Sequence, residues 1–445
     1  MSEKIDCEKK SKTEENEKTD YDPFEHREIE KPISDIRATA NLVKSSLGSG
    51  LLAGPLAFVQ SGWGIGILGT IIVGILCGHC IHILVETSRG CCRKEKKPML
   101  GYAETCKSTF SNGPKCVRRF ANAASIITEF ALTCTYVGVC CIYTVLISDS
   151  IKQLVDRYAP SFIIPSEYYS LIMLIPFCVL CQIKYLKWLA IFSLLANILL
   201  VATYLICLYY IFGGEISFAD KVAVGNPARY PAFLSTVIFA MEGVGVVMPV
   251  ENEMKRPKHF LGCPSVLVVA MSIIVFLYST LGLFGYFRYG DALKGSITLN
   301  LPIDDWPAIC AKVFIALSIF FTYPLQFFVV FDVFTRYVKP RIKENYWSTT
   351  QFVARILGVC FCVIIGVALP LLEQIINIVG AMFYSILGII IPAVIETVFR
   401  WYDLGRYNWV LWKNIVIILF GSFILISGCT VTISDIVRIL TTRTE

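Results

Sequence analysis

Residues 48–55 read GSGLLAGP and residues 243–249 read GVGVVMP, and these two stretches decide how the chain is expected to fold. Each begins with Gly-x-Gly and two aliphatic residues and reaches a proline four or five positions after the second glycine. Glycine permits non-helical dihedrals, and proline removes an amide donor and clashes with the preceding turn. Each stretch therefore predicts a helix that unwinds near its middle.

Both stretches lie within long apolar segments of a hydrophobic chain. Of the 445 residues, 55% are hydrophobic and 17% are charged, and the mean hydropathy is +0.63. Soluble domains carry about 25% charged residues. A membrane-spanning helix needs roughly 20 mostly apolar residues, and such segments recur from residue 38 to residue 435. The composition therefore predicts an all-α integral membrane protein and leaves no room for a large soluble domain.

Eleven segments have the length and composition of a membrane span. They lack the strict alternation and the length of about ten residues typical of barrel strands, so helices are expected. The predicted spans are 38–60, 64–87, 121–148, 168–186, 189–212, 232–254, 262–287, 307–334, 351–371, 376–399 and 411–435.

The two predicted breaks fall in the first and the sixth span, five helices apart. Because five is odd, the second group of five helices enters the membrane inverted relative to the first. The sequence therefore predicts a 5+5 inverted repeat, with repeat one at 38–212, repeat two at 232–399 and an extra helix at 411–435. Transporter folds place such interruptions at corresponding positions of two repeats, around a substrate near the bilayer midplane. Close helix packing is the alternative, since Gly and Pro are common in membrane helices.

The two chain ends are expected on opposite sides of the membrane. Lys and Arg bias loops toward the cytoplasm, and 29 of them lie on the N-terminal side against 8 on the other. Residues 1–37 are rich in Glu and Lys and predict a disordered cytoplasmic tail, a solvated leader or a site for signalling partners. Residues 436–445 form a short outer or luminal C-terminus. The net charge of +6 reflects this topology, because no basic stripe with interleaved aromatics indicates nucleic-acid binding.

The two breaks together predict a binding site for a zwitterion. Unwound backbone cannot face lipid, because each unpaired N–H or C=O there costs several kcal/mol, so it must line an enclosed chamber. Amides at the start of a half-helix bind anions. We therefore expect the amides of Gly48, Ser49 and Gly50 to bind a carboxylate, and the carbonyls of 241–245, from Met241 and Glu242 through Gly243 to Gly245, to receive an amine. The residues beside both breaks are small or aliphatic, which favours small neutral substrates.

Five strings of the sequence resemble the proton-assisted amino acid transporters of the amino acid/auxin permease group. They are 41–57 (NLVKSSLGSGLLAGPLA), 79–85 (HCIHILV), 239–254 (FAMEGVGVVMPVENEM), 296–302 (SITLNLP) and 320–327 (FFTYPLQF). The resemblance implies an eleven-helix LeuT-type fold, import of glycine, alanine, proline or similar amino acids, and co-transport of protons at the plasma or lysosomal membrane. Thr322 and Tyr323, in the last string, are further candidates for substrate binding.

Two departures from this family bear on the mechanism. Asn41 stands where proton-coupled members look to carry a histidine, and asparagine does not titrate near physiological pH. Members also tend to have an outer-loop disulfide with one cysteine just after the SITLNLP string. This chain has Asp304 and Asp305 there, and no cysteine in 149–168.

Ionisable and hydroxyl side chains within spans are candidates for ion coupling, because burying them is costly. Glu242 abuts the second break and is the first candidate for a group that carries a proton or shapes the site. Glu129 is the second, and packing hydrogen bonds are the alternative for both. Lys44 is expected to snorkel or to pair with an acid. Ser318 and Thr322, one turn apart, offer oxygens to a cation such as Na⁺ or bond their own backbone.

Other function classes find little support in the sequence. His79 and His82 lie beside Cys77 and Cys80 on one continuous helix, where tetrahedral closure is hard, so no metal site is expected. There is no P-loop, GxSxG or HExxH motif, so the protein is not expected to be an enzyme. No pore motif or ring of charge indicates a channel.

Two hypotheses remain for the function. The first is a secondary active transporter of small neutral amino acids, which works by alternating access and needs no cofactor beyond a coupling ion, H⁺ or Na⁺. The second is a transceptor that senses an amino acid and transports it slowly or not at all. Both need the same pocket in the lipid bilayer, so the sequence leaves both open.

Overall fold

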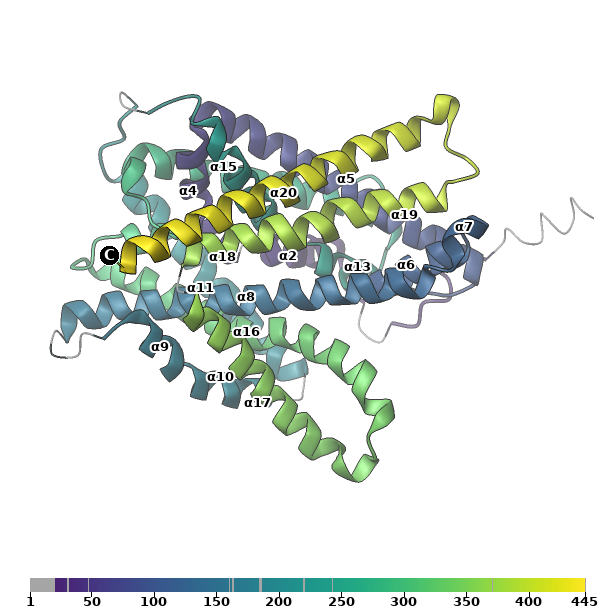
Figure 1. Cartoon of the computed structure of the whole chain (residues 1–445), viewed down its shortest axis with the longest axis horizontal. Helices are drawn as coiled ribbons and strands as arrows, with labels where there is room; N and C mark the ends of the chain where they lie inside the picture. Colours follow the sequence, from purple (N-terminus) through teal and green to yellow (C-terminus); the bar gives the residue numbers. More distant parts are fainter. Residues whose placement is uncertain are drawn as a thin grey trace, which may run out of the picture.

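The computed structural model describes residues 21–29, 32–46, 48–159, 161, 164–183, 186–218, 221–241, 243–369 and 371–444. The regular secondary structure of these residues is helical, and one isolated bridge joins Ile33 to Met254. Most of the long helices run between two ends of the molecule, at the left and right of Figure 1.

The helices are α2 (Asp35–Ser46), α3 (Ser49–Leu52), α4 (Gly54–Ser61), α5 (Trp63–Glu95), α6 (Tyr102–Ser111), α7 (Lys115–Arg118), α8 (Ala121–Tyr158), α9 (Ser166–Ile172), α10 (Leu174–Cys181), α11 (Leu186–Phe212), α12 (Tyr230–Met241), α13 (Val244–Glu253), α14 (Lys258–Leu261), α15 (Val266–Tyr289), α16 (Trp306–Val338), α17 (Glu344–Ala368), α18 (Leu372–Ile378), the π-helix η6 (Val379–Ile390), α19 (Ile391–Phe399) and α20 (Trp409–Thr444). Short 3-10 turns lie at η2 (Pro227–Arg229), η3 (Gly290–Ala292), η4 (Ile297–Asn300), η5 (Lys339–Arg341) and η7 (Arg406–Asn408).

Nine helical segments of the described chain are long and apolar enough to cross a membrane. They correspond to the predicted spans other than the first and the fourth. The first is divided into α2, α3 and α4, and the fourth is the shorter apolar segment Ser166–Cys181, which a turn at Met173 divides into α9 and α10. The eleven predicted spans thus appear as nine long apolar segments, which include the broken sixth span, and two that are divided into shorter helices.

The helix predicted to break in the first span is broken. Helix α2 ends at Ser46, Gly48 has φ −62° and ψ −147°, and α3 continues for only four residues. A turn at Ala53 follows, and Pro55 then lies in the first turn of α4, where proline is tolerated because its missing N–H has no helical partner.

The sixth span is broken as well, with one difference from the prediction. Helix α12 ends at Met241, and α13 begins at Val244 after Gly243, which has φ −116° and ψ 13°. Pro249 was expected to take part in the break, but it lies inside α13. Because proline carries no N–H, it leaves the carbonyl four residues earlier, that of Gly245, without its usual helical donor.

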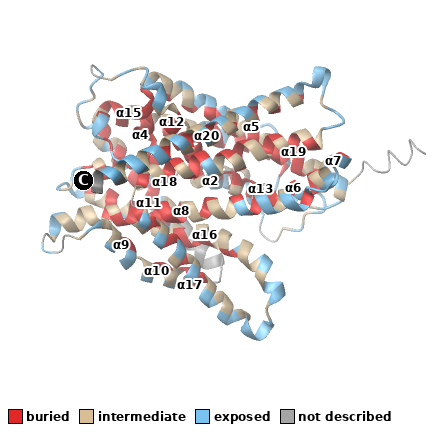
Figure 2. Cartoon of the chain, viewed as in Figure 1, coloured by how far each residue is buried: buried red, intermediate tan, exposed pale blue. Residues whose placement is uncertain are grey.

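The helices pack around a core that runs the length of the molecule. Figure 2 shows buried residues along the central helices and exposed ones at the periphery and the two ends. Apolar side chains such as Ile75 and Ile426 are more than two-thirds exposed. A broad apolar surface of this kind marks contact with a membrane.

The two described chain ends lie at opposite ends of this bundle. Ile33 exchanges backbone hydrogen bonds with Glu253 and Lys255, at the end of α13. Asp435 of α20 pairs instead with Arg229 of η2, directly before the start of α12. Because α12 and α13 together form one span, the N-terminal segment and the C-terminal helix end on different faces. We call the face of the N-terminal segment the N-terminal face.

The N-terminal segment differs from the expected disordered tail over its described part. Residues 1–20, 30 and 31 lie outside the described residues, but 21–29 and 32–37 pack on the N-terminal face. The Arg27 guanidinium, 3% exposed, lies 3.0 Å from the Glu251 carboxylate, which is 2% exposed. A buried charge must be paired, so this segment is held by an interaction that its charged composition did not reveal.

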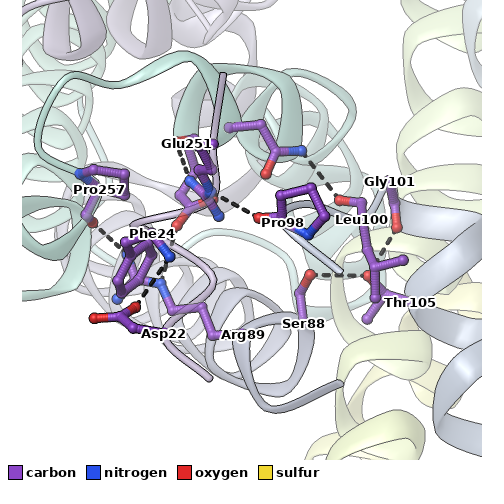
Figure 3. Close-up of polar contacts among 12 residues, drawn as sticks. Asp22, Phe24, Ser88, Arg89, Pro98, Leu100, Gly101, Thr105, Glu251 and Pro257 are labelled. Atoms are coloured by element: carbon purple, nitrogen blue, oxygen red, sulfur yellow. Dashed lines mark hydrogen bonds and ion pairs between the residues drawn. The ribbon is translucent and has the colours of Figure 1, made fainter. Parts of the chain in front are cut away.

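Phe24 lies at the centre of this contact. Figure 3 shows Phe24 beside Asp22, Arg89 and Pro257, with Glu251 close by. Three cations approach the Phe24 ring at 5.0–5.6 Å from its centroid, namely Arg27, Arg89 and Lys258. We call residues 21–29, with Phe24 and Arg27, the N-terminal anchor. It joins the chain start to α5, α13 and α14.

Candidate functional site

Both helix breaks line one small chamber with a volume of about 40 Å³. The first break contributes main chain and hydroxyls, the second contributes main chain, and aromatic side chains from other helices close the walls. The lining residues are Ser45, Ser46, Gly48, Ser49, Gly50, Tyr136, Val139, Tyr143, Phe239, Gly243, Gly245, Val246, Gln326 and Tyr384.

Glycines allow the elements around the chamber to approach each other closely. A Cβ atom on Gly50 would lie 2.7 Å from the Cα atom of Ala240 in α12, a contact that only a shift of backbone could relieve. A Cβ on Gly245 would lie 2.0 Å from the Tyr136 hydroxyl, and one on Gly243 would lie 2.9 Å from Ser45 Oγ. The glycines are therefore required by packing as well as by the backbone conformation of the breaks.

A larger cavity of about 520 Å³ continues from the chamber. We call it the vestibule. It shares Ser45, Gly48, Tyr136, Tyr143, Gly245, Val246 and Gln326 with the chamber. Its other lining residues include Asn41 and Lys44 of α2, Glu253 of α13, and Val329 of α16. Since α2 begins and α13 ends at the N-terminal face, the vestibule leads from the breaks toward that face.

On the other side of the chamber the helices are in contact. Gly50 lies against the backbone of Ala240, and the Gln60 amide of α4 donates a hydrogen bond of 2.7 Å to Glu373 of α18. Phe58 of α4 is fully buried, and its ring lies where Cβ atoms on Gly66 and Gly282 would be. The chamber therefore communicates with one face of the membrane and is closed toward the other.

The structure brings together five of the predicted substrate-binding residues and separates others. Gly48, Ser49, Gly50, Gly243 and Gly245 all line the chamber. Glu242, predicted both to bind substrate and to couple an ion, lies outside the described residues.

Met241 and Tyr323 are not on the wall of either cavity. Met241 is fully buried, and its Sδ atom lies near Gly74 of α5. Tyr323 is also fully buried, and its ring stacks on Phe177 of α10 with the centroids 4.0 Å apart. The helical turn directs both side chains into the packing between helices. Tyr323 was a candidate from the last of the resembling strings, whereas Met241 was predicted for its main-chain carbonyl, which the position of its side chain does not test.

The two predicted hydroxyl residues of α16 line the vestibule. Ser318 Oγ donates a hydrogen bond of 2.7 Å to the carbonyl of Ala196 in α11, and Thr322 Oγ1 donates one of 2.8 Å to the carbonyl of Ser318. Each hydroxyl thus satisfies its proton on backbone, and its oxygen lone pairs remain to accept from water or a cation. Asn41, the position at which the family resemblance implies a histidine, lies on the vestibule wall as well.

Glu129 does not face the chamber or the vestibule. Its carboxylate lies 2.9 Å from the Arg336 guanidinium and accepts a hydrogen bond from the Tyr337 hydroxyl. These partners join α8 to the end of α16. The predicted coupling role of Glu129 therefore receives no support from its position, and the packing alternative fits the contacts.

Several lining residues escaped the sequence analysis. Tyr136 and Tyr143 of α8 lie two helical turns apart on the same face as Glu129, and that spacing of seven was the signal that could have found them. Gln326 Nε2 lies 3.5 Å from the Tyr143 hydroxyl. No sequence pattern indicated Tyr384. It reaches the chamber from a π-helix, and the local sequence did not predict the wider helical turn there.

The π-helix η6 positions the aromatic wall. Wider turns of this kind are found frequently at functional sites. Tyr384 packs edge-on against Phe239, with ring centroids 5.7 Å apart. Gly380 allows the close approach of η6 to α12, because a Cβ there would lie 2.0 Å from the Ser235 carbonyl oxygen. Among the described residues, no group of three or more His, Cys, Asp or Glu side chains could hold a metal ion.

Solved structures with a similar fold are transporters. The chain is similar to the nucleobase-cation-symport-1 family transporter Mhp1 in a closed conformation with bromovinylhydantoin bound, with a TM-score of 0.52 and 13% identity over 92% of this chain and 91% of that one. It is also similar to the inward facing conformation of Mhp1, with a TM-score of 0.55 and 14% identity over 94% and 92% of the two chains. The likeness confirms the predicted LeuT-type fold.

Relatives with similar sequences are also described as transporters. The chain is 38% identical over 420 residues to the proton-coupled amino acid transporter-like protein pathetic of Drosophila melanogaster, covering 94% of this chain and 88% of the relative. It is 26% identical over 378 residues to the amino acid transporter ANT1 of Arabidopsis thaliana, covering 81% and 83%. These relatives are transporters and not enzymes. The family model described as transmembrane amino acid transporter protein matches residues 31–434, so the chain belongs to that family of amino acid transporters.

Proposed function

We propose that the protein is a secondary active transporter that carries small neutral amino acids across a membrane by alternating access, coupled to protons. The observation that supports this most is the meeting of two interrupted helices at one chamber, which a vestibule joins to a single face. A chamber closed toward one side and connected to the other is one of the two end states that alternating access requires.

The chamber suits the two ends of an amino acid. The first amides of a helix lack intrahelical partners, and those of Ser49 and Gly50 begin α3 at the chamber. They would bind the substrate carboxylate. The carbonyl of Gly243 accepts hydrogen bonds from the amides of Val246 and Val247. The carbonyl of Gly245 has no such helical donor, because the residue four positions later is Pro249, which has no N–H. We therefore assign the substrate amine to Gly245 within the predicted group.

The walls favour a small substrate without net charge. The described lining residues of the chamber include no Asp, Glu, Lys, Arg or His. Tyr136, Tyr143, Phe239 and Tyr384 fill the space beyond the main-chain groups. A charged side chain on the substrate would be buried there without a partner, which is costly. Glycine, alanine and proline are the substrates we propose.

The proton is the coupling ion that we propose, because the Drosophila relative is described as proton-coupled. Asn41 cannot replace the family histidine as a titrating group. Glu242, next to the second break, remains the candidate that carries the proton. The hydroxyls of Ser318 and Thr322 would serve Na⁺ instead, and the coupling experiment below separates the two ions.

We place the N-terminal face in the cytoplasm, on the Lys and Arg count of the loops. The vestibule then opens inward. The membrane is the plasma membrane or that of the lysosome.

Uptake by purified protein in proteoliposomes tests this proposal. We expect saturable uptake of labelled glycine, alanine or proline that rises when the outside is made more acidic than the inside, at constant Na⁺. Uptake that follows a Na⁺ gradient and ignores pH would overturn proton coupling. Saturable binding without uptake would identify the protein as a transceptor, and absence of both would refute the amino acid site.

A further inference from the structure

A second pocket of about 440 Å³ lies at the N-terminal face, apart from the chamber and the vestibule. It is formed where the end of α5 meets α14 and the end of α19. Its lining residues are Glu86, Thr87, Arg89, Gly90, Arg93, Lys94, Leu261, Phe399 and Arg400.

The pocket carries an excess of positive charge. Four cations and one carboxylate line it. Arg89 is paired with Glu251, and Arg400 is paired with Glu86 at 2.8 Å and with Glu396 at 3.7 Å. Arg93 and Lys94 make no ion pair with any described residue. Two guanidinium groups held in salt bridges thus stand beside two cations that form none with a described residue, although the charge of Arg93 also acts on the Asp22 carboxylate.

One wall of the pocket is apolar. Phe399 packs over Gly90, where a Cβ would lie 2.2 Å from the ring atom Cζ. The Lys94 ammonium lies 4.2 Å from the centroid of the same ring. Leu261 of α14 forms part of the same wall. A ligand of this pocket would therefore meet cations and apolar carbon side by side.

The pocket lies at the level where the apolar helix surface gives way to charge. Helix α5 crosses the membrane and ends in Arg93, Lys94 and Glu95. Next to it, α15 begins at Val266, a few residues after α14, and the side chain of Val268 in its first turn is 62% exposed. Lipid-facing apolar surface therefore begins beside the pocket. A soluble anion would contact only the cations, whereas an anionic lipid would contact the cations with its headgroup and the apolar surface with its acyl chains.

From this arrangement we propose that the pocket binds the phosphorylated headgroup of an anionic phospholipid, with a phosphoinositide as the best fit. Phosphate monoesters accept several charge-assisted hydrogen bonds, and arginine presents its donors in a geometry that matches them. Basic pockets between membrane helices on the cytoplasmic side bind such headgroups. Arg93 and Lys94 would contact the phosphate, and Phe399 and Leu261 would contact the glycerol and acyl carbons.

Binding of a short-chain phosphatidylinositol bisphosphate to the purified full chain in detergent tests the proposal. The variant Arg93→Gln/Lys94→Gln removes the two cations that form no salt bridge with a described residue. Its matched control is Lys107→Gln/Lys115→Gln, which removes two exposed cations from α6 and α7 on the same face. We expect saturable binding that the first variant weakens by about 25-fold, from roughly fivefold for each cation, and that the control leaves unchanged.

Two soluble or neutral probes separate the sources of the phosphate. Phosphatidylcholine of the same chain length should not bind measurably, and inositol trisphosphate should bind much more weakly than the lipid. Equal binding of inositol trisphosphate and the lipid would show a site for a soluble anion and overturn the lipid assignment. Equal weakening by both double variants would show that only the overall charge of the face matters, and would overturn the pocket itself.

Discussion

At the scale of single residues, the substrate site is built from main chain rather than from distinctive side chains. Glycine at 48, 50, 243 and 245 gives the two breaks their backbone freedom and lets neighbouring helices approach. Tyr136, Tyr143 and Tyr384 then shape the space that remains. Substitution of a glycine at a break should therefore abolish uptake, whereas substitution of a side chain on the chamber wall should change which substrates are accepted.

Among the chamber glycines at the two breaks, Gly50 is the one at which an added side chain would meet the backbone of a neighbouring helix. Alanine at this position would place a methyl group 2.7 Å from backbone of α12, so we expect Gly50→Ala to abolish uptake and to destabilise the fold by about 1–3 kcal/mol, as overpacking does. Uptake and thermal unfolding of the purified variant measure this. Gly78→Ala is the control, because its methyl group would meet Met271 at an ordinary 3.5 Å. Full activity of Gly50→Ala would contradict the close contact.

Val139 selects substrate by size. It lines the chamber from α8, and Val139→Ala removes two methyl groups from the wall. We expect larger amino acids such as leucine to gain roughly tenfold in competition with alanine, the order of magnitude that one or two methylenes give in an apolar pocket. Val145→Ala, a buried valine of the same helix away from the chamber, serves as the control. The same gain in both variants would mean that the wall at Val139 does not limit substrate size.

At the scale of elements, the breaks were predictable and their surroundings were not. Gly-x-Gly followed by proline is a local signal, so the breaks at Gly48 and Gly243 followed from sequence. Tyr384 lies on a π-helix that packs against α12 and α20, and the Tyr323 side chain points away from the site because of helical phase. The anchor at 21–29 depends on a pairing between Arg27 and Glu251, 224 positions apart. Such pairings leave no trace in local composition.

The N-terminal anchor should contribute measurably to stability. Removing one partner of a buried ion pair costs about 3–5 kcal/mol, and Glu251 keeps Arg89, so we expect Arg27→Ala to cost about 3 kcal/mol. Thermal unfolding in detergent measures the change. Arg37→Ala, an exposed arginine of the same segment, should have little effect. Equal melting temperatures for the two variants would argue against the anchor.

The anchor should also withstand mild acid. Burial alone would raise the pKa of Asp22, but the hydrogen bond from the Phe24 amide and the Lys258 ammonium outweigh it, so the pKa of Asp22 lies below its usual 3.8. A lowered carboxyl pKa stabilises the fold above the unfolded pKa and loses that effect only as pH falls through the folded value. The destabilisation caused by Asp22→Asn should therefore be constant between pH 8 and pH 5. A steep decrease across that range would contradict this charge state.

At the scale of the whole molecule, the described state opens to one face. The vestibule leads from the breaks along α2, α13 and α16 to the N-terminal face, while Gly50 and Gln60 mark contacts on the other side. The sequence predicted eleven spans and an inverted repeat, because these follow from hydropathy and from the spacing of the breaks. It could not predict which face is open, because both end states of alternating access would share the same sequence.

Labelling of an introduced cysteine tests this state. Val329→Cys places a thiol on the vestibule wall, and we expect a membrane-impermeant reagent to modify it from the N-terminal face, with less modification when substrate is present. Mass spectrometry of the peptide separates this thiol from the native cysteines. Ala311→Cys, fully buried in the same helix, should stay unmodified. Modification of Val329→Cys only from the opposite face would reverse the assignment.

The claim on which the account depends is that the main chain of the two breaks holds the amino acid. An experimental structure of the protein saturated with alanine tests it most directly. We predict that the alanine carboxylate lies within hydrogen-bond distance of the amides of 48–50 and its amine within reach of the Gly245 carbonyl. Alanine bound elsewhere, or first and sixth spans that run uninterrupted, would contradict the account.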